Sequence, residues 1–250
     1  MSNKILKKII NIFGYKLVEK NFIKNQRILM QKSDLTVDKV LEYMFKKKYI
    51  KHIVQVGAND GISYDHINYF IKKYKIKSLL VEPIKKSFLL LKKNYRNLNY
   101  VNLENSAITT NNEIKHLYKV NEKYLKQYDK VVNAISSFNF QHLLKFGVKK
   151  KNILKETVNQ ISLFDLLKKY KIKNFDLLYI DTEGYDCHIV NNFIKKNRIR
   201  PIIIFEWVHA PNDALTESLK LLDTNNYFIL PVDQDLFCIP KKKNIKLLLN

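Results

Sequence analysis

Two pairs of polar side chains in this sequence have the types and spacing needed to handle a proton. Asp181 and Glu183 directly follow one apolar stretch, and Glu206 and His209 follow another. A carboxylate or an imidazole beside a hydroxyl can take its proton as the oxygen reacts, which typically accelerates the reaction by about 10²–10⁴-fold. We therefore predict Asp181 and Glu183 as the first candidates for a general base, with Glu206 and His209 as secondary candidates.

These side chains also have other interpretations. A metal site formed by Asp181, Glu206 and His209 is chemically feasible, but the three lack close ligand spacing in the sequence, so we predict no metal. Glu183 would alternatively accept backbone N–H groups in a turn, with Gly184 allowing a tight entry to the next helix. A single loop histidine such as His209 often has no special role.

A second signal is a glycine turn between a β-branched run at residues 53–56 and a helical pattern at residues 64–74. Glycine permits backbone angles closed to other residues, and the following helix offers free N–H groups, so a nucleotide-type cofactor is expected here. The dinucleotide pattern G-x-G-x-x-G would need glycine where Asn59 and Ile62 stand, which disfavours NAD. The turn consists of Gly57, Ala58, Asn59, Asp60 and Gly61.

An acidic residue follows this turn at the distance expected for a ribose ligand. Glu82 lies 21 positions beyond Gly61, at the end of an apolar run and before Pro83. A carboxylate there accepts hydrogen bonds from ribose hydroxyls in nucleotide-binding folds. The alternative is a solvated acid in a turn.

These residues fall into a chain of alternating strands and helices, which predicts one doubly wound α/β domain over residues 51–250 after a helical extension over residues 1–50. In such a fold, ligands bind outside the carboxyl ends of the strands, where the polar residues above lie. Residues 113–120 are expected to form an outer strand or hairpin arm, and residues 121–155 are the least regular, with a short helix at 140–146. The predicted strands cover residues 52–56, 78–82, 100–103 running on toward 107–108, 157–161, 175–180, 201–205, 227–230 and 236–239, and the predicted helices cover residues 36–48, 64–74, 85–95, 163–170, 186–196 and 213–223.

Composition is consistent with a folded cytoplasmic protein. The chain has 250 residues, of which 46% are hydrophobic, enough for a substantial core. No apolar run approaches the roughly 20 residues that span a bilayer, the first 20 residues do not resemble a secretory signal, and two cysteines are too few for a disulfide framework. An amphipathic segment in residues 1–31 would suit peripheral contact with a membrane, although packing on the domain is the simpler expectation.

The net charge of +22 suggests contact with a polyanion. Lysine is spread along the whole chain, however, and its longest clusters have three residues, as at 46–48, 149–151 and 241–243. This distribution favours a general bias in composition over a nucleic-acid site, and an acidic polysaccharide would suit the charge as well as RNA.

Taken together, these motifs resemble the FkbM-type methyltransferases, which use S-adenosylmethionine and have the class I methyltransferase (Rossmann-like) fold. The order and separation of the motifs agree with the family over about residues 50–240. The matching segments are Val56–Gly61, Val81–Pro83, Asn105–Ile108, Ser136–Phe138, Ile180–Asp186 and Pro201–Glu206.

The resemblance implies a seven-stranded sheet and assigns the cofactor-binding residues. The loop Gly57–Gly61 would hold the methionine end of S-adenosylmethionine, Glu82 and the adjoining Pro83 the ribose, and Ser106 and Ala107 the adenine. Asp181 would contact cofactor or acceptor. Many class I enzymes have an acid where this chain has Gln55, whose amide oxygen can still accept a hydrogen bond from the cofactor's amino group.

The resemblance also implies an O-methyltransferase acting on a sugar hydroxyl of a surface polysaccharide or another glycosylated product. One alternative keeps the fold and changes the acceptor to RNA, although no RNA-binding module is visible. A second alternative is a non-catalytic binding module, which the intact loop and the Asp181–Gly184 segment disfavour. The sequence carries no signal for an oligomeric state.

Overall fold

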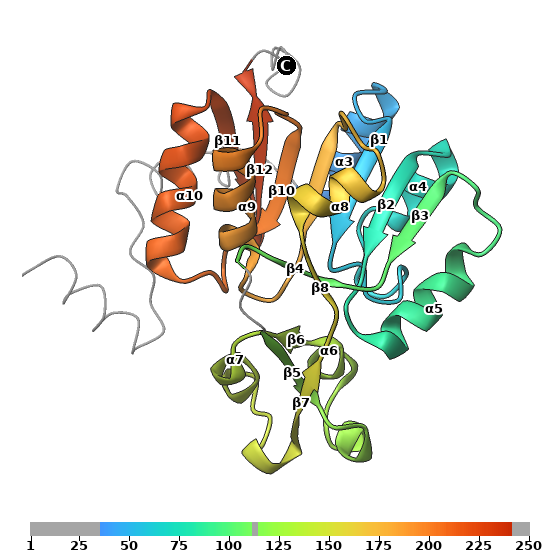
Figure 1. The fold of residues 1–250 in the computed structure, drawn as a ribbon, viewed down its shortest axis with the longest axis vertical. Coiled ribbons are helices and arrows are strands. Elements are labelled where there is room, and N and C mark those ends of the chain that lie inside the picture. The colour runs from blue at the N-terminus through green and yellow to red at the C-terminus, as the bar shows by residue number, and fades with distance from the viewer. Residues whose placement is uncertain (1–35, 112–114, 242–250) are drawn as a thin grey trace, which may run out of the picture.

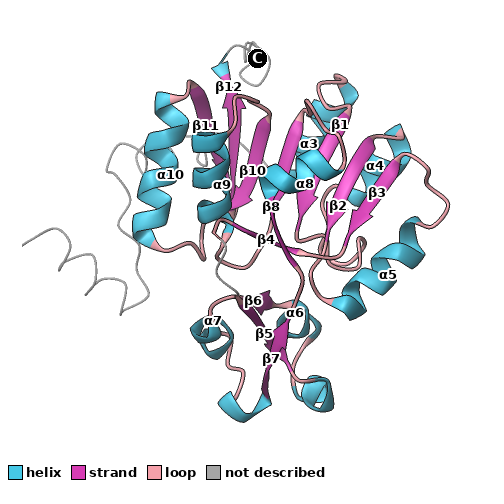
Figure 2. Ribbon diagram, in the orientation of Figure 1, coloured by secondary structure: helices cyan, strands magenta, loops and turns pink. Residues whose placement is uncertain are grey.

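The computed structural model of the protein describes residues 36–111 and 115–241. Its main body is a seven-stranded sheet with helices on both faces, as Figures 1 and 2 show. A smaller three-stranded sheet lies below the main body in this view, on the side toward which the arrowheads of β10 and β3 point. The predicted doubly wound α/β fold with a seven-stranded sheet is confirmed.

The main sheet reverses its direction of winding beside β1. Its strand order is β11-β12-β10-β9-β1-β2-β3, so the chain first moves outward through β2 and β3 and then returns to the other side of β1. Neighbours from β3 to β10 are parallel, whereas β12 is antiparallel to both β10 and β11. Such a switch point creates a crevice at the carboxyl ends of the central strands. The strands are β1 (His52–Val56), β2 (Lys77–Val81), β3 (Val101–Glu104), β9 (Leu177–Ile180), β10 (Ile202–Glu206), β11 (Tyr227–Val232) and β12 (Asp235–Pro240).

Each central strand is buried on both faces because alternate side chains enter different cores. In β10, Ile203 and Phe205 pack under helices α8, α9 and α10, whereas Ile202 and Ile204 pack under α3, α4 and α5. This period of two explains why the strand is apolar throughout. The helices are α3 (Val37–Lys46), α4 (Asn68–Tyr74), α5 (Lys85–Tyr95), α8 (Leu163–Lys169), α9 (Asp186–Lys196) and α10 (Asn212–Thr224).

The helix α3, which belongs to the predicted N-terminal extension, packs onto the main sheet. The Oγ1 atom of Thr36 accepts the backbone N–H of Lys39 and caps the helix. Phe45 stacks on Phe70 of α4 with ring centroids 4.6 Å apart. The amphipathic segment at residues 1–31 lies outside the described residues. Within the described ranges, no helix combines the length and apolar character needed to cross a membrane.

The small sheet has a core of its own. Its central strand β5 (His116–Val120) is antiparallel to β6 (Ser136–Ser137) and β7 (Ile153–Thr157). The outer strand or arm predicted at residues 113–120 is thus the centre of a separate sheet. Its buried apolar residues are Val120, Val132, Ile135, Leu143 and Val148. The accompanying helices are α6 (Lys130–Ala134) and α7 (Phe140–Lys145), and the 3₁₀ helices are η1 (Glu122–Gln127) and η2 (Lys150–Asn152).

Three predicted boundaries are wrong. The strand expected to continue from 100–103 to 107–108 is broken, and β4 (Ala107–Thr109) pairs instead with β8 (Gln160–Ser162) in a parallel two-stranded ribbon. The single strand expected at 157–161 is divided between β7 and β8. The helix expected from residue 64 begins at Asn68, because Oδ1 of Asp65 accepts the backbone N–H groups of Ile67 and Asn68 and ends the preceding loop there.

Candidate active site

A cavity of about 250 Å³ lies at the carboxyl ends of β1, β2, β3 and β9. One wall comes from the main sheet and its loops, and the facing wall comes from the small sheet, including Ile135, Ser136 and Phe138. The sequence predicted the residues of the first wall. Of the second wall it indicated only the Ser136–Phe138 segment, as a match to the family, without placing it at the cavity. The predicted residues in the lining are Gln55, Gly57, Ala58, Asn59, Glu82, Pro83, Ser106, Ala107, Asp181 and Glu183.

Gly57 is required by the contact between two strand ends. Its φ of +86° lies in the left-handed region, and a Cβ atom there would lie 1.7 Å from the backbone oxygen of Asp181. Only glycine fits such an approach without moving a backbone. The N–H groups of Gly57 and Ala58 both donate to the carbonyl of Val81, at 2.9 and 3.0 Å, which fixes the start of the loop on β2.

Glu82 links the end of β2 to the glycine loop. Its Oε2 accepts the N–H of Asn59 at 2.9 Å, and its Oε1 accepts the N–H of Ile84 at 2.7 Å. Burial raises the pKa of the Glu82 carboxyl to about 7, against the opposing effect of these N–H donors. A carboxylate has about four acceptor positions, so two remain for the hydroxyls of a ribose in the cavity.

Gln55, which lies in β1 just before the glycine loop, supplies another acceptor. Its Nε2 donates to Oδ2 of Asp65 at 3.2 Å, whereas its buried Oε1 has no hydrogen-bond partner among the described residues. A buried acceptor left without a donor costs about 1–3 kcal/mol. An ammonium group in the cavity would satisfy it, so the glutamine fits the position at which many class I enzymes have an acid.

Asp60 and Gly61 lie beside the cavity and are absent from its lining. The carboxylate of Asp60 accepts the N–H groups of Ile62 and Ser63 and so closes the turn locally. Gly61 packs against α5, where a Cβ atom would lie 2.5 Å from Cδ1 of Leu91. Both residues shape the loop, and the contact with the cofactor predicted for them stays a prediction.

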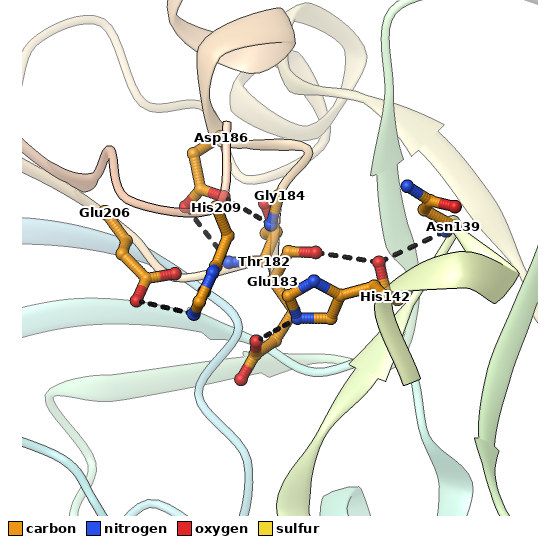
Figure 3. Close-up of polar contacts among 9 residues, drawn as sticks. Asn139, His142, Thr182, Glu183, Gly184, Asp186, Glu206 and His209 are labelled. Carbon is orange, nitrogen blue, oxygen red and sulfur yellow. Dashed lines mark hydrogen bonds and ion pairs between the residues drawn. The ribbon is translucent and has the colours of Figure 1, made fainter. Parts of the chain in front are cut away.

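The turn after β9 is held by Asp186. Its Oδ1 accepts the N–H of Thr182 and its Oδ2 accepts the N–H of Gly184, both at 3.1 Å, as Figure 3 shows. Burial raises the pKa of the Asp186 carboxyl to about 7. The backbone-holding role considered for Glu183 therefore belongs to Asp186, and Glu183 is available for other contacts.

Glu183 bonds to a histidine that sequence reasoning did not select. Its backbone has a φ of +53°, and its Oε2 lies 2.8 Å from Nε2 of His142 on α7 (Figure 3). The hydroxyl of Ser137 donates to the backbone carbonyl of Glu183 at 2.7 Å. His142 has no motif spacing of its own. Its only sequence signal is its position five residues after Ser137, the middle residue of the matched Ser136–Phe138 segment.

Glu206 and His209 lie beside Glu183 in Figure 3 and are absent from the cavity lining. Nε2 of His209 is 3.6 Å from Oε1 of Glu206 and its ring is 4.8 Å from that of His142, measured between centroids. Burial, followed by the charges of Asp181 and other nearby carboxylates, raises the pKa of Glu206 to about 10. Burial and neighbouring carboxylates, Asp186 first, also raise the pKa of Asp181 well above its ordinary value. Among the described residues, His209 forms a cluster with His142 and Glu183 in which the possible ligand atoms lie within 4.8 Å of one another.

The family profile described as "Methyltransferase FkbM domain" matches residues 55–229, which is most of the chain. The chain belongs to the FkbM methyltransferase family. S-adenosylmethionine is the cofactor of this FkbM methyltransferase, and the lining fits it: Gln55 offers an acceptor for the amino group and Glu82 acceptors for the ribose. The match begins at Gln55 and ends in β11, so it includes every predicted site residue.

The solved structures that match this chain include methyltransferases, at low sequence identity. An FkbM methyltransferase from Methylobacillus flagellatus KT has 12% identity and a TM-score of 0.43, over 76% of this chain and 43% of that chain. This chain thus spans less than half the length of that protein. An O-methyltransferase from Bacillus cereus in complex with SAH has 9% identity and a TM-score of 0.43, over 94% of this chain and 97% of that one. The O-methyltransferase TomG from Streptomyces achromogenes, in complex with SAM, has 8% identity and a TM-score of 0.43, over 96% and 99% of the two chains. A comparison with functionally curated proteins gives no significant match.

Proposed function

We propose that this FkbM methyltransferase transfers the methyl group of S-adenosylmethionine to a hydroxyl of a sugar, in a surface polysaccharide or another glycosylated product. The observation that carries the proposal is that Glu183 lines the same cavity as Gln55, Gly57 and Glu82. Proton-accepting groups thus lie beside the cofactor residues.

The division of the cavity supports O-methyl transfer. Apart from Asp181, the residues predicted to hold the cofactor come from the segments after β1, β2 and β3, whereas Asp181 and Glu183 lie at the end of β9. An alcohol is a poor nucleophile while it keeps its proton, so a carboxylate beside it can accelerate the reaction by accepting that proton. Asp181 and Glu183, the first candidates from the sequence, both line the cavity, and we propose them as the catalytic residues.

The reaction needs little from the protein apart from alignment and removal of one proton. The bound cofactor supplies a methyl group on a positively charged sulfur. Gln55, Gly57 and Glu82 would hold the cofactor, and the acceptor oxygen would receive the methyl group as the carbon–sulfur bond breaks with its electron pair left on sulfur. The proton of the hydroxyl would pass to the carboxylate of Asp181 or of Glu183 and then to solvent. Because burial raises the pKa of Asp181, that carboxyl would serve only in its ionised form. Holding the oxygen in line behind the methyl group can contribute about 7–11 kcal/mol.

The acceptor side is built by the small sheet. Phe138 offers an apolar surface at the cavity and packs edge-on against Tyr185, with ring centroids 5.0 Å apart. The net charge of +22 suits an acidic glycan. These features, together with the family resemblance, favour a glycan over a small apolar acceptor.

A methyl-labelled cofactor provides the test. The full chain would be incubated with labelled S-adenosylmethionine and, in separate reactions, a uronic-acid oligosaccharide, a neutral oligosaccharide, a nucleotide sugar and RNA. We expect label in a sugar-containing acceptor, recovered as an O-methyl sugar by mass spectrometry. Label in RNA alone would replace the glycan with the RNA alternative. Failure to bind the cofactor at millimolar concentration would contradict the enzyme assignment altogether.

A further inference from the structure

Three side chains from three separate parts of the fold meet beside the cavity. His142 comes from α7, Glu183 from the turn after β9, and His209 from the segment between β10 and α10 (Figure 3). One ligand atom from each lies within 4.8 Å of the other two. We propose that His142, Glu183 and His209 bind a divalent transition-metal cation, with Zn²⁺ as the best match.

The carboxylate of this site is held in place by backbone contacts. Asp186 fixes the turn on both sides of Glu183 through the N–H groups of Thr182 and Gly184. The hydroxyl of Ser137 donates to the carbonyl of Glu183 itself. These bonds maintain a φ of +53° at Glu183, a conformation that is sterically unfavourable for a non-glycine residue. The side chain is thereby directed toward the two imidazoles, and little further ordering is needed to bind an ion.

The two histidines are also ordered before any ion binds. The side chain of His142 is 6% exposed and that of His209 is 28% exposed. Phe146 packs edge-on against both rings, with centroid distances of 5.0 Å to His142 and 5.3 Å to His209. An apolar wall of this kind excludes water from one side of the cluster and leaves the other side for the ligands.

The acidic groups around the cluster suit a cation. Asp186 holds the turn at Glu183, and an oxygen of Glu206 lies 3.6 Å from Nε2 of His209, so a bound cation would favour the ionised forms of these carboxyl groups. The chain contains 45 lysine and arginine residues, yet in the described ranges none of them forms an ion pair with any of these three carboxyl groups. Buried negative charge in proteins is normally balanced by a basic side chain or by a metal.

The ligand types select the ion. Two imidazole nitrogens with one carboxylate oxygen suit Zn²⁺ and related transition metals, whereas Mg²⁺ and Ca²⁺ prefer oxygen ligands throughout. Two atoms bound at 2.0–2.1 Å in a tetrahedral zinc site lie about 3.3 Å apart. The 2.8 Å contact between His142 and Glu183 would open slightly, and the widest separation in the cluster, at most 4.8 Å, would close by about 1.5 Å. Rotation of side chains can provide both changes.

Three protein ligands leave a fourth tetrahedral position open, as in catalytic zinc sites. Glu183 belongs both to this cluster and to the lining of the cavity. An acceptor hydroxyl in the cavity would occupy the open position, and its proton would become more acidic there. This role rests on the proposed function, whereas binding of the ion does not. The proposal replaces the sequence-based expectation of no metal and uses a different set of residues.

The metal itself is the probe for the test. Untagged full-length protein would be freed of metal with a chelator and titrated with ZnCl₂ by calorimetry, with binding of S-adenosylhomocysteine measured in parallel. We expect one equivalent of tightly bound Zn²⁺. The variants His142→Ala and His209→Ala should each weaken binding by at least about 100-fold, because removing a partner of a ligand already costs 10–100-fold. His116→Ala is the matched control, since His116 lies on β5 and bonds to Thr157, away from the cluster; its affinity for zinc should not change.

The outcomes are separable. Preserved circular dichroism and preserved S-adenosylhomocysteine binding would show that the His142 and His209 variants remain folded. Substitution by Co²⁺ gives an independent reading, because visible absorption typical of tetrahedral cobalt should occur in the wild type and disappear in both variants. The site would be overturned if the wild type bound no stoichiometric zinc, or if both variants bound zinc as tightly as the wild type. The contact between His142 and Glu183 would then be a simple hydrogen bond. Zinc binding without methyl transfer to any hydroxyl would retain the site and reject the proposed function.

Discussion

The hydroxyl of Ser137 donates a 2.7 Å hydrogen bond to the backbone carbonyl of Glu183, across 46 positions of sequence. The hydroxyl oxygen of Ser137 also accepts the backbone N–H of Asn139. The side chain of Asn139 in turn caps α7, the helix that carries His142. One buried hydroxyl therefore connects the small sheet to the turn after β9 and sets His142 opposite Glu183.

Removal of this hydroxyl should lower turnover without lowering cofactor affinity. In Ser137→Ala, the carbonyl of Glu183 and the N–H of Asn139 both lose their partner, which should cost about 1–3 kcal/mol of stability. Methyl-transfer kinetics and S-adenosylhomocysteine calorimetry would measure the two effects separately. A variant with wild-type turnover would show that Ser137 does not position the acceptor side.

Affinity for the cofactor should depend on pH through Glu82. The carboxyl has a pKa of about 7 in the ligand-free protein, where burial outweighs the N–H donors, with smaller effects from Glu156 and Lys119. Ribose hydroxyls bind the ionised form, so affinity should rise as pH increases through 7 and then level off. Below that pH it should fall by up to about tenfold per unit. Calorimetry with S-adenosylhomocysteine between pH 6 and 8 measures this, and Glu82→Gln should remove most of the dependence.

Glu82 should affect the stability of the ligand-free protein in the opposite direction. The native carboxyl keeps its proton up to about pH 7, whereas the unfolded one loses it near 4.5. Between these values the native state binds more protons, so the contribution of Glu82 to stability is lost as pH rises from 4.5 to 7. Urea unfolding of wild type and Glu82→Gln across this range should diverge accordingly. Parallel curves would mean that Glu82 titrates normally in the fold.

Gly57 and Gly147 form a matched pair for testing the loop. Both have positive φ, +86° and +78°, but a Cβ atom would overlap the backbone of Asp181 at Gly57 and meet nothing within 4 Å at Gly147. Gly147→Ala should lose only the conformational cost of about 1–2 kcal/mol. Gly57→Ala should lose at least a further 1–3 kcal/mol, approximately the cost of overpacking, together with cofactor binding. Equal unfolding free energies for the two variants would contradict the close contact between β1 and β9.

Asp181 and Asp186 should respond differently to the same substitution. In Asp186→Asn, one carboxylate oxygen becomes an NH₂ group facing a backbone N–H, so the turn should lose about 1–3 kcal/mol. Asp181→Asn should retain stability and lower the turnover number, because Asp181 is one of the residues that line the cavity. Thermal unfolding and methyl-transfer kinetics of the two variants would compare these roles. Unchanged turnover in Asp181→Asn would remove Asp181 from the proposed mechanism.

The cofactor half of the site could be predicted because its signals are local. The strand–turn–helix around Gly57 and the strand ending at Glu82 each depend on residues close together in sequence. In such segments, apolar residues spaced at two residues in a strand, or at 3.6 in a helix, indicate which face is buried. The same argument identified β9 and β10 from their apolar runs. It failed at Ala107 and at residues 157–161, because strands of three residues have too short a pattern to show where pairing begins or changes partner.

The order of the elements, the doubly wound fold, the family and the cofactor loop can thus be inferred from the sequence alone. The acceptor half required the tertiary structure. His142 reaches Glu183 across 41 positions only because the small sheet packs against the turn after β9, and His209 joins them from a third segment. Contacts between loops depend on how whole layers pack, and no periodicity within a segment encodes which side chains will meet. The sequence offered four candidate proton acceptors, and the fold selected Glu183 as the one that joins the cavity to two histidines.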